Sequence, residues 1–492
     1  MPLRSRNRTG HRVNEVVNLA RGVIVAGISG EDLDDAAPRF GGYLLFPSAD
    51  APIERVRALT DALRARHSGA APIVAIDQEG GAVMRLRNGV EPIPSMMALG
   101  AADGLELAER AGEQIAFDLR RAGVTLDFAP VLDLALEAEN SVIGTRSFGA
   151  DPRRVAALGG ALGQGLRNGG ILPCYKHFPG HGSTAVDSHE ALPVVDADER
   201  TLRARDLLPF AALAPEAPAM MSAHVVVRAF HPARPATLSH RIAGDLLRGE
   251  LGFRGALFTD CLEMGAIGAA GVAAGVEALA AGADLLVFSH RPDFASAAVD
   301  AIADAVARGT LARERLEEAY GRANALRAAG APPRPVDAIA PHPGVGREVG
   351  RRAVTLVRGI AHADPIASLA VSFGSGGAAL EREAPALALC EVSIDPAPDE
   401  MRGALTALET SGRRPLLLAR RAHRHPGQVA AIARILDRYP DALVVSLLEP
   451  FDVPLFGAAR HLLATCGDGV ASMRGLADVI FGGSLPGGRL PL

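Results

Sequence analysis

Three histidines and the only lysine of the chain fall within one short segment, residues 174–189. Two glycines and a proline within this segment predict a loop. Asp187 and His189 lie two residues apart, close enough in a turn for the carboxylate to accept a hydrogen bond from the imidazole ring. Such a bond would orient the ring and favour its protonated form, which makes His189 a candidate general acid that later acts as a base.

Three interpretations fit the polar residues of this loop. Their side chains could tie the loop together by hydrogen bonds. They could instead ligate zinc, with four candidate ligands: His177, His181, Asp187 and His189. The HxxxH spacing, however, falls on a Gly/Pro loop, and no HExxH motif supports a metal. In the third interpretation an acid/base pair works with a nucleophile elsewhere. Asp260, at the end of an apolar run, is the candidate nucleophile, although a lone aspartate there is ordinarily a helix cap.

Eight short apolar runs of strand type recur in the first two thirds of the chain: 23–28, 42–46, 73–77, 125–130, 172–177, 219–224, 256–260 and 284–288. Between them, stretches rich in Ala, Leu and Arg place apolar residues at helical spacing, so strands and helices should alternate. Eight such units in about 300 residues predict an α/β fold built on a (β/α)₈ TIM-type barrel.

Polar residues collect where these runs end: Asp77, Asp133, Lys176, His177, His224 and Asp260. The carboxyl ends of barrel strands all face one mouth, where barrel enzymes place their catalytic groups. Any one of these residues could be a helix cap or a loop residue. Their occurrence at equivalent positions predicts a shared site.

Three prolines in the segment 331–337, APPRPVD, cannot continue a helix and predict an interdomain linker. We therefore expect a catalytic barrel over residues 1–330 and a smaller domain over 338–492. In the latter, apolar strands alternate with Ala-rich helices, which predicts a three-layer α/β sandwich. The segment FGSGGAA (373–379) partly matches a dinucleotide fingerprint, but we favour a tight turn there and expect no cofactor and no metal.

Composition narrows the classes of partner. The net charge of −5, with no basic run, argues against nucleic acid and against anionic membranes, so we expect a small-molecule substrate. Trp is absent and Tyr occurs four times, so stacking platforms for long polysaccharides are scarce. The four cysteines form no CxxC pair, and no run of about 18 apolar residues occurs. We expect a cytoplasmic protein, and both a monomer and a homodimer are compatible with the sequence.

Several segments resemble glycoside hydrolase family 3, and more narrowly its β-N-acetylglucosaminidase branch. They are AIDQEGG (75–81), NSVIGTRSFG (140–149), KHFPGHGSTAVDSH (176–189), MSAHV (221–225), RPATLS (234–239) and LGFRGALFTDCLEMGAI (251–267). KHFPGHG followed by DSH is highly specific to that branch. The C-terminal GGSLPGGRLPL resembles the end of the family's second domain.

The resemblance implies a retaining, two-step hydrolysis that releases terminal GlcNAc from short glycosides such as muropeptide or chitin fragments. Asp260 stands at the position of the family's nucleophile, and His189, held by Asp187, would protonate the leaving oxygen. A histidine is not an anionic base, so phosphate could approach without repulsion, and a β-N-acetylglucosaminide phosphorylase is the first alternative. A β-glucosidase and a non-catalytic sugar-binding barrel are the others.

The resemblance also implies the sugar-binding residues, position by position: Asp77, Arg85, Arg146, Lys176 and His177. Their types suit hydroxyl groups, because charge-assisted hydrogen bonds are the stronger kind. His224 should support the site from behind. After the nucleophile, Cys261 and Glu263 depart from the branch's commonest pattern, which leaves the aglycone open.

Overall fold

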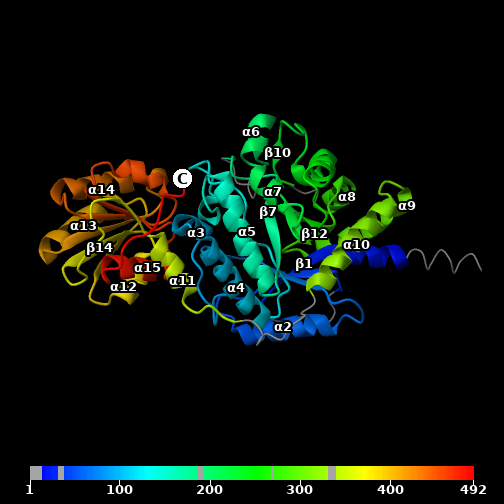
Figure 1. The fold of residues 1–492 in the computed structure, drawn as a ribbon, viewed down its shortest axis with the longest axis horizontal. Helices are drawn as coiled ribbons and strands as arrows, with labels where there is room; N and C mark the ends of the chain where they lie inside the picture. The colour runs from blue at the N-terminus through cyan, green and yellow to red at the C-terminus, as the bar shows by residue number, and fades with distance from the viewer. Residues whose placement is uncertain (1–13, 31–37, 185–191, 268–270, 331–339) are drawn as a thin grey trace, which may run out of the picture.

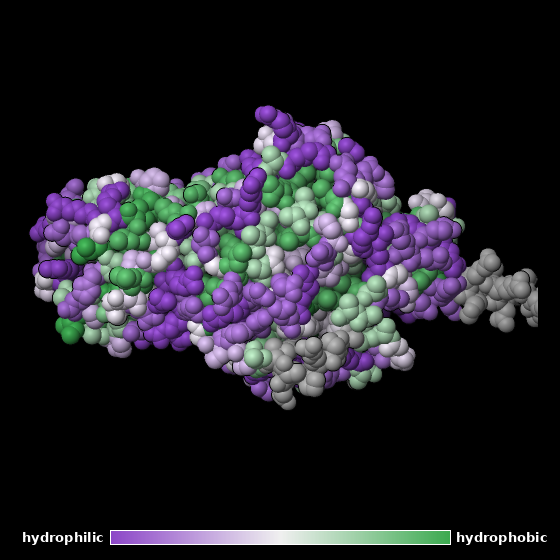
Figure 2. Space-filling view, in the orientation of Figure 1, coloured by the Kyte–Doolittle hydropathy of each residue, from purple (hydrophilic) through white to green (hydrophobic). Residues whose placement is uncertain are grey.

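The computed structural model describes residues 14–30, 38–184, 192–267, 271–330 and 340–492. Two domains lie side by side along the long axis of the molecule, a barrel coloured blue to green and a C-terminal domain coloured yellow to red (Figure 1). Hydrophilic side chains cover most of the face shown in Figure 2, and apolar residues gather there in small groups. No described helix is long and apolar enough to cross a membrane.

Eight parallel strands close the barrel in the order β1-β12-β11-β9-β7-β6-β3-β2. They are β1 (Ile24–Ser29), β2 (Gly42–Phe46), β3 (Ile73–Ile76), β6 (Leu126–Asp127), β7 (Leu172–Phe178), β9 (Ala219–Ser222), β11 (Ala256–Cys261) and β12 (Leu285–Phe288). Each strand arises from one of the eight apolar runs. The predicted (β/α)₈ barrel is therefore confirmed.

Helices cover the outside of the barrel: α2 (Ile53–Ala65), α3 (Met96–Ala102), α4 (Leu105–Arg121), α5 (Pro152–Asn168), α6 (Glu199–Ala204), α7 (Leu208–Leu213), the π-helix η3 (Arg241–Glu250), α8 (Gly271–Ala281), α9 (Pro292–Arg308) and α10 (Arg313–Gly330). The N-terminus of α5 shows the local logic: Asp151 caps it by accepting hydrogen bonds from two backbone amides, and proline stands in its first turn. Its close packing on α4 depends on Gly165, where a Cβ would lie 2.0 Å from the carbonyl oxygen of Glu109.

Short elements complete the barrel mouth: β4 (Gln78–Gly80), β5 (Val83–Met84), η1 (Gly144–Arg146), β8 (Val194–Val195), β10 (Val226–Val227) and η2 (Ala236–Leu238). β4 and β5 pair as an antiparallel hairpin directly after β3. Inside the barrel, apolar side chains fill the space below the mouth, and the rings of Phe128 and Phe258 meet edge to face with centroids 5.2 Å apart. The barrel is therefore a packed core with one open end.

The second domain holds a six-stranded sheet in the order β13-β18-β17-β16-β14-β15, in which only β13 is antiparallel. Its elements are α11 (Val345–Ala353), β13 (Thr355–Arg358), β14 (Ser368–Phe373), α12 (Gly377–Glu383), β15 (Ala388–Val392), α13 (Pro398–Ser411), β16 (Arg414–Ala419), η6 (Ala422–Arg424), α14 (Pro426–Arg438), β17 (Leu443–Ser446), η7 (Pro450–Phe456), β18 (His461–Ala464) and α15 (Val470–Ile480). One core packs the sheet against α13 and α14, and another packs it against α12 and α15. The three-layer sandwich is as predicted.

The join between the domains runs through α11, which packs against α15 and also against the barrel helices α3 and α4. The predicted linker, residues 331–337, lies outside the described residues, so the domain boundaries stay predictions. The glycine-rich segment before α12 contains two residues with positive φ, Gly374 at 74° and Gly376 at 121°. These angles suit the tight turn expected there.

Candidate active site

A cavity of about 420 Å³ opens at the carboxyl ends of the barrel strands. It is lined by Leu44, Phe46, Asp77, Glu79, Val83, Arg85, Phe128, Val142, Arg146, Lys176, His177, His181, Met221, Asp260, Cys261, Glu263, Met264, Gly265, Val287, Ser289 and His290. All five predicted sugar-binding residues and the predicted nucleophile are among them. These six residues come from four barrel strands or the segments that follow them: β3, β6, β7 and β11.

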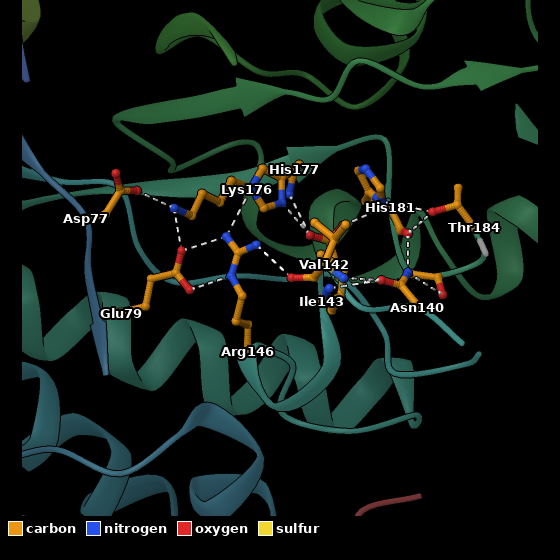
Figure 3. Close-up of polar contacts among 12 residues, drawn as sticks. Asp77, Glu79, Asn140, Val142, Ile143, Arg146, Lys176, His177, His181 and Thr184 are labelled. Carbon is orange, nitrogen blue, oxygen red and sulfur yellow. Dashed lines mark hydrogen bonds and ion pairs between the residues drawn. The ribbon is translucent and has the colours of Figure 1, made fainter. Parts of the chain in front are cut away.

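Lys176 is buried at the end of β7, with a side chain only 2% exposed. Its ammonium nitrogen lies 2.7 Å from Oδ1 of Asp77 and 2.6 Å from Oε1 of Glu79, as Figure 3 shows. Burial alone would lower the pKa of Lys176, but the two carboxylates raise it above its usual value. The lysine is therefore a permanent cation at the base of the cavity.

Glu79 also holds Arg146 through two hydrogen bonds, from Nε at 2.8 Å and from a terminal nitrogen at 2.7 Å. This bidentate pairing suits the planar guanidinium. Burial would raise the pKa of Glu79, but Arg146 and Lys176 hold it well below its usual range. Arg146 comes from η1, so this one carboxylate connects the β4–β5 hairpin, β7 and the loop that carries η1.

His177 is oriented by Asp133. Its Nδ1 lies 2.6 Å from Oδ2 of that carboxylate, and its backbone amide donates to the same oxygen at 3.1 Å. Oδ1 of Asp133 accepts a hydrogen bond from the backbone amide of His181 at 2.6 Å. Burial raises the pKa of Asp133, but the neighbouring histidines lower it below its usual value. The opposite ring nitrogen of His177 lies 3.4 Å from Arg146.

Asp260 stands near the end of β11 and lines the cavity. Its Oδ1 accepts a hydrogen bond of 2.7 Å from the backbone amide of Cys261. Burial acts to raise the pKa of Asp260, yet His177, His224, this hydrogen bond and Lys176 together lower it. The carboxylate is therefore ionised at neutral pH, which is the state that a nucleophile requires.

His224 lies behind the cavity wall, with only 1% of the residue exposed. Its Nε2 lies 2.9 Å from the carbonyl oxygen of Cys261, the residue after Asp260, and its Nδ1 lies 2.9 Å from the hydroxyl of Thr237. The ring thus contacts the backbone next to the candidate nucleophile. It does not contribute to the lining of the cavity.

Arg85 occupies the outer part of the cavity. Its guanidinium carbon lies 5.2 Å from the centroid of the Phe46 ring, within the range of a cation–π contact. The Phe46 ring also lies against the ring of His290, with centroids 4.9 Å apart. All three side chains line the cavity, so its wall includes an aromatic part as well as the charged cluster around Lys176.

Asp187 and His189 lie outside the described residues, and their roles stay predictions. The chain before them is well anchored. Asn140 donates a hydrogen bond of 3.0 Å to the carbonyl oxygen of His181, and the hydroxyl of Thr184 lies 3.0 Å from the ring of His181 (Figure 3). His181 lines the cavity, so the described chain up to Thr184 is held beside the cavity wall.

Glu79 and Asp133 hold predicted site residues in place, and the sequence analysis assigned neither of them a role. Both had a signal: Glu79 follows Asp77 by two positions in AIDQEGG, and Asp133 stands at a strand end. A buried lysine needs carboxylate partners. A search for acidic residues near the other strand ends would therefore have identified Glu79 as a candidate partner of Lys176. In the described part of the chain, no group of three or more His, Cys, Asp or Glu side chains could hold a metal ion.

Comparison of the sequence and the structure with known proteins identifies the family of this chain. The glycosyl hydrolase family 3 N-terminal domain matches residues 35–326. A beta-hexosaminidase from Chromobacterium violaceum is 40% identical over 326 residues, which is 63% of this chain and 89% of that protein. A solved glycoside hydrolase family 3 beta-N-acetylglucosaminidase from Paenibacillus sp. str. FPU-7 superposes with a TM-score of 0.87 at 33% identity, over 96% of this chain and 98% of that one.

A third similarity is one of fold alone. The structure of the beta-glucoside phosphorylase BglX bound to 2FGlc superposes with a TM-score of 0.80 over 98% of this chain and 96% of that one, but at 20% identity. The motifs predicted from the sequence, the two-domain fold and the match over more than half of the chain agree. The chain belongs to glycosyl hydrolase family 3.

Proposed function

We propose that this protein is a retaining exo-β-N-acetylglucosaminidase that hydrolyses terminal GlcNAc from short glycosides. The observation that carries the proposal is the position of Asp260, an ionised carboxylate in the same cavity as the Lys176, Asp77 and Glu79 cluster. The cluster supplies charged donors and acceptors for sugar hydroxyls, and Asp260 supplies a nucleophile for the anomeric carbon.

The identity of the sugar is supported by the relatives. The similar proteins from Chromobacterium violaceum and Paenibacillus bear the names beta-hexosaminidase and beta-N-acetylglucosaminidase. The specificity is tested by comparing kcat/KM for aryl β-GlcNAc and aryl β-glucose substrates. A preference for the glucoside would favour the β-glucosidase alternative instead.

In the first step, Asp260 attacks the anomeric carbon and forms a covalent bond through one carboxylate oxygen. The bond from the anomeric carbon to the aglycone oxygen breaks, and its electron pair goes to that oxygen. His189, oriented by Asp187, gives the leaving oxygen a proton. The support for this pair is the KHFPGHG and DSH motif and the anchoring of its first part at the cavity wall.

In the second step, His189 takes a proton from a water molecule as the water attacks the same carbon. The bond to Asp260 breaks and its carboxylate is restored, so one water is consumed for each glycoside cleaved. Two inversions at the anomeric carbon give net retention of configuration. A histidine here replaces one of the two carboxylates usual in glycosidases.

Exo action is supported by the shape of the cavity. Below the mouth the barrel interior is closed by packed side chains such as Phe128 and Phe258. A blind pocket accepts a chain end better than the middle of a polymer. Short fragments of peptidoglycan or chitin, processed in the cytoplasm, are the substrates that we assign.

The test is trapping of the covalent intermediate. A dinitrophenyl glycoside of a 2-fluoro sugar should react once and stop, because fluorine slows both steps while the good leaving group permits the first. Mass spectrometry should find the sugar on Asp260, with Asp260→Asn as the unlabelled control. Fragmentation must separate Asp260 from Cys261, because label on the adjacent thiol would overturn the assignment.

Water as the acceptor is tested separately from the nucleophile. The protein is incubated with an aryl GlcNAc glycoside, with and without phosphate, and the sugar products are separated. Free GlcNAc under both conditions supports hydrolysis. GlcNAc 1-phosphate as the main product would replace the hydrolase by a phosphorylase and leave the role of Asp260 intact.

A further inference from the structure

A second cavity, of about 350 Å³, lies between the two domains. The barrel contributes residues between 81 and 95 together with Thr145, and the C-terminal domain contributes residues between 420 and 472. We call it the interdomain cavity. Its volume lies at the lower end of the range of roughly 300–1,000 Å³ typical of small-molecule sites.

The cavity of the candidate active site, at the carboxyl ends of the barrel strands, is called the sugar cavity below. The interdomain cavity is separate from the sugar cavity but shares a wall with it. Along the β4–β5 hairpin, Glu79 and Val83 line the sugar cavity, whereas Gly81 and Met84 line the interdomain cavity. A ligand between the domains would therefore contact the back of the hairpin that holds Glu79.

On the side of the C-terminal domain, the cavity lies where parallel strands end. Arg420 follows β16, Leu448 comes shortly after β17, and Gly467 comes shortly after β18. In open α/β sheets, ligands bind outside the carboxyl ends of the strands. The interdomain cavity therefore lies where α/β domains of this kind commonly bind ligands.

The N-terminus of α15 places partial positive charge at the wall of the interdomain cavity. Gly469 precedes this 11-residue helix and provides no side-chain cap, and residues 469–472 all line the cavity. The first backbone amides of a helix have no partner within it, and the helix dipole places partial positive charge there. Anions bind readily at such an end.

Ser472, in the first turn of α15, provides an independent sign of a ligand. The residue is 1% exposed, and its hydroxyl has no hydrogen-bond partner among the described residues. The hydroxyl faces Gly467, another residue of the cavity wall, since a Cβ at Gly467 would lie 2.6 Å from Oγ of Ser472. A buried hydroxyl without a partner is costly, and a ligand oxygen would satisfy it.

The charged side chains that line the cavity are three arginines and a single aspartate. Asp468 is neutralised by Arg420 at 2.7 Å, and Arg421 lies 3.3 Å from Glu449. Arg87 donates to the carbonyl oxygen of Met84 at 3.1 Å, and no carboxylate within the described residues pairs with it. Within the described residues one unpaired arginine, Arg87, therefore shares this cavity with a helix N-terminus and an unsatisfied hydroxyl.

We propose that the interdomain cavity binds a phosphate group, either as free phosphate or as the phosphomonoester of a small metabolite. A phosphate anion suits the unpaired guanidinium of Arg87 and the positive end of α15, and its several oxygens can accept hydrogen bonds from the α15 amides, from Ser472 and from Arg87. The site is independent of the sugar cavity and of the reaction proposed there.

The test is isothermal titration of the full chain with inorganic phosphate and with glucose 6-phosphate, at constant ionic strength. Each titration is run both without and with saturating GlcNAc, which occupies the sugar cavity. The variants are Arg87→Ala and Ser472→Ala. Their matched controls are Arg438→Ala, an exposed arginine that does not line the cavity, and Ser296→Ala, a half-buried helical serine of the barrel domain. Thermal unfolding of each variant checks its fold.

We expect saturable binding of one phosphate group per chain, with affinity reduced about tenfold or more in Arg87→Ala and in Ser472→Ala, and unchanged in both controls. Tighter binding of the sugar phosphate identifies a phosphomonoester, and equal binding identifies free phosphate; both support the site. Absence of saturable binding at millimolar concentrations, equal binding by all variants, or competition by GlcNAc would overturn it. Because hydrolysis is not the readout, this outcome is independent of the proposed function.

Discussion

The ammonium group of Lys176 lies 2.7 Å from Oδ1 of Asp77, a residue 99 positions earlier in the chain. The same nitrogen contacts Glu79 at 2.6 Å. In a chain where all other strongly basic side chains are arginine, the one lysine is buried between two carboxylates at the base of the sugar cavity. A compact ammonium fits there, whereas a planar guanidinium needs more room and a fixed set of acceptor directions.

Replacing this lysine by arginine, Lys176→Arg, should therefore reduce kcat/KM for aryl GlcNAc about a hundredfold, because charged hydrogen bonds contribute roughly 1.5–3 kcal/mol each. Arg460→Lys, at a residue whose side chain is 63% exposed, is the matched control and should change kcat/KM little. Thermal unfolding separates a damaged fold from a damaged site. A Lys176→Arg enzyme with near-normal kcat/KM would refute the role of the lysine in binding sugar.

Asp260→Asn should lower kcat by about four orders of magnitude or more, as removal of a nucleophile does in other enzymes that form covalent intermediates. The unfolding temperature should stay close to that of the wild type, since the amide can keep the hydrogen bond from Cys261. Asp293→Asn, at an exposed carboxylate, serves as the control. Substantial turnover by Asp260→Asn would remove this residue from the mechanism.

His189→Ala should affect substrates according to their leaving groups. Poor leaving groups need a proton on the departing oxygen, whereas activated phenols leave without it. We expect a large loss of kcat/KM on alkyl or disaccharide substrates and a much smaller loss on a dinitrophenyl glycoside. Asp187→Ala should show the same pattern more weakly. Losses of equal size on both substrate types would contradict an acid role for His189.

His224→Gln should move the acidic limb of the kcat/KM profile. Burial acts to raise the pKa of Asp260, and His224 is among the groups that lower it. In the wild type, activity should therefore fall only as the pH drops below the usual aspartate pKa of about 3.9, where the nucleophile becomes protonated. Without the histidine the pKa of Asp260 rises, so the fall should begin at higher pH. An unmoved limb, measured in short assays, would show that His224 does not act on Asp260.

Asp127→Asn should change the pH dependence of stability. Burial raises the pKa of Asp127 to about 8, although the backbone amide of Gln78 donates to its Oδ1, and Oδ2 has no partner among the described residues. Between the unfolded pKa of about 3.9 and the folded value, the native state holds a proton that the unfolded state releases, so the free energy of unfolding falls as pH rises.

The variant lacks this titration. Its unfolding temperature should therefore exceed that of the wild type by a margin that grows from pH 5 to pH 8. Asp300→Asn, at an exposed aspartate on α9, is the control and should show no such trend. A margin that stays constant, or that shrinks with rising pH, would mean that Asp127 is ionised in the folded protein across this range.

Most strands of the barrel can be predicted from the local sequence. Its strands are continuous apolar runs because both faces of a barrel strand are buried. The polar residues that follow them meet because parallel strands end at the same mouth. In the second domain three of the four interior strands, β14, β16 and β17, stand out in the same way. β13 and β15 do not, because both are edge strands with partly exposed, polar-interrupted sequences.

The sequence therefore predicts the types of the site residues and their common location at the barrel mouth. It does not predict which of their side chains contact one another. Glu79 joins Lys176 and Arg146, and Asp133 holds His177 across 44 residues. The interdomain cavity likewise needs residues from both domains. Such contacts depend on strand register, loop path and domain packing, which are set by the free energy of the whole fold rather than by local pattern.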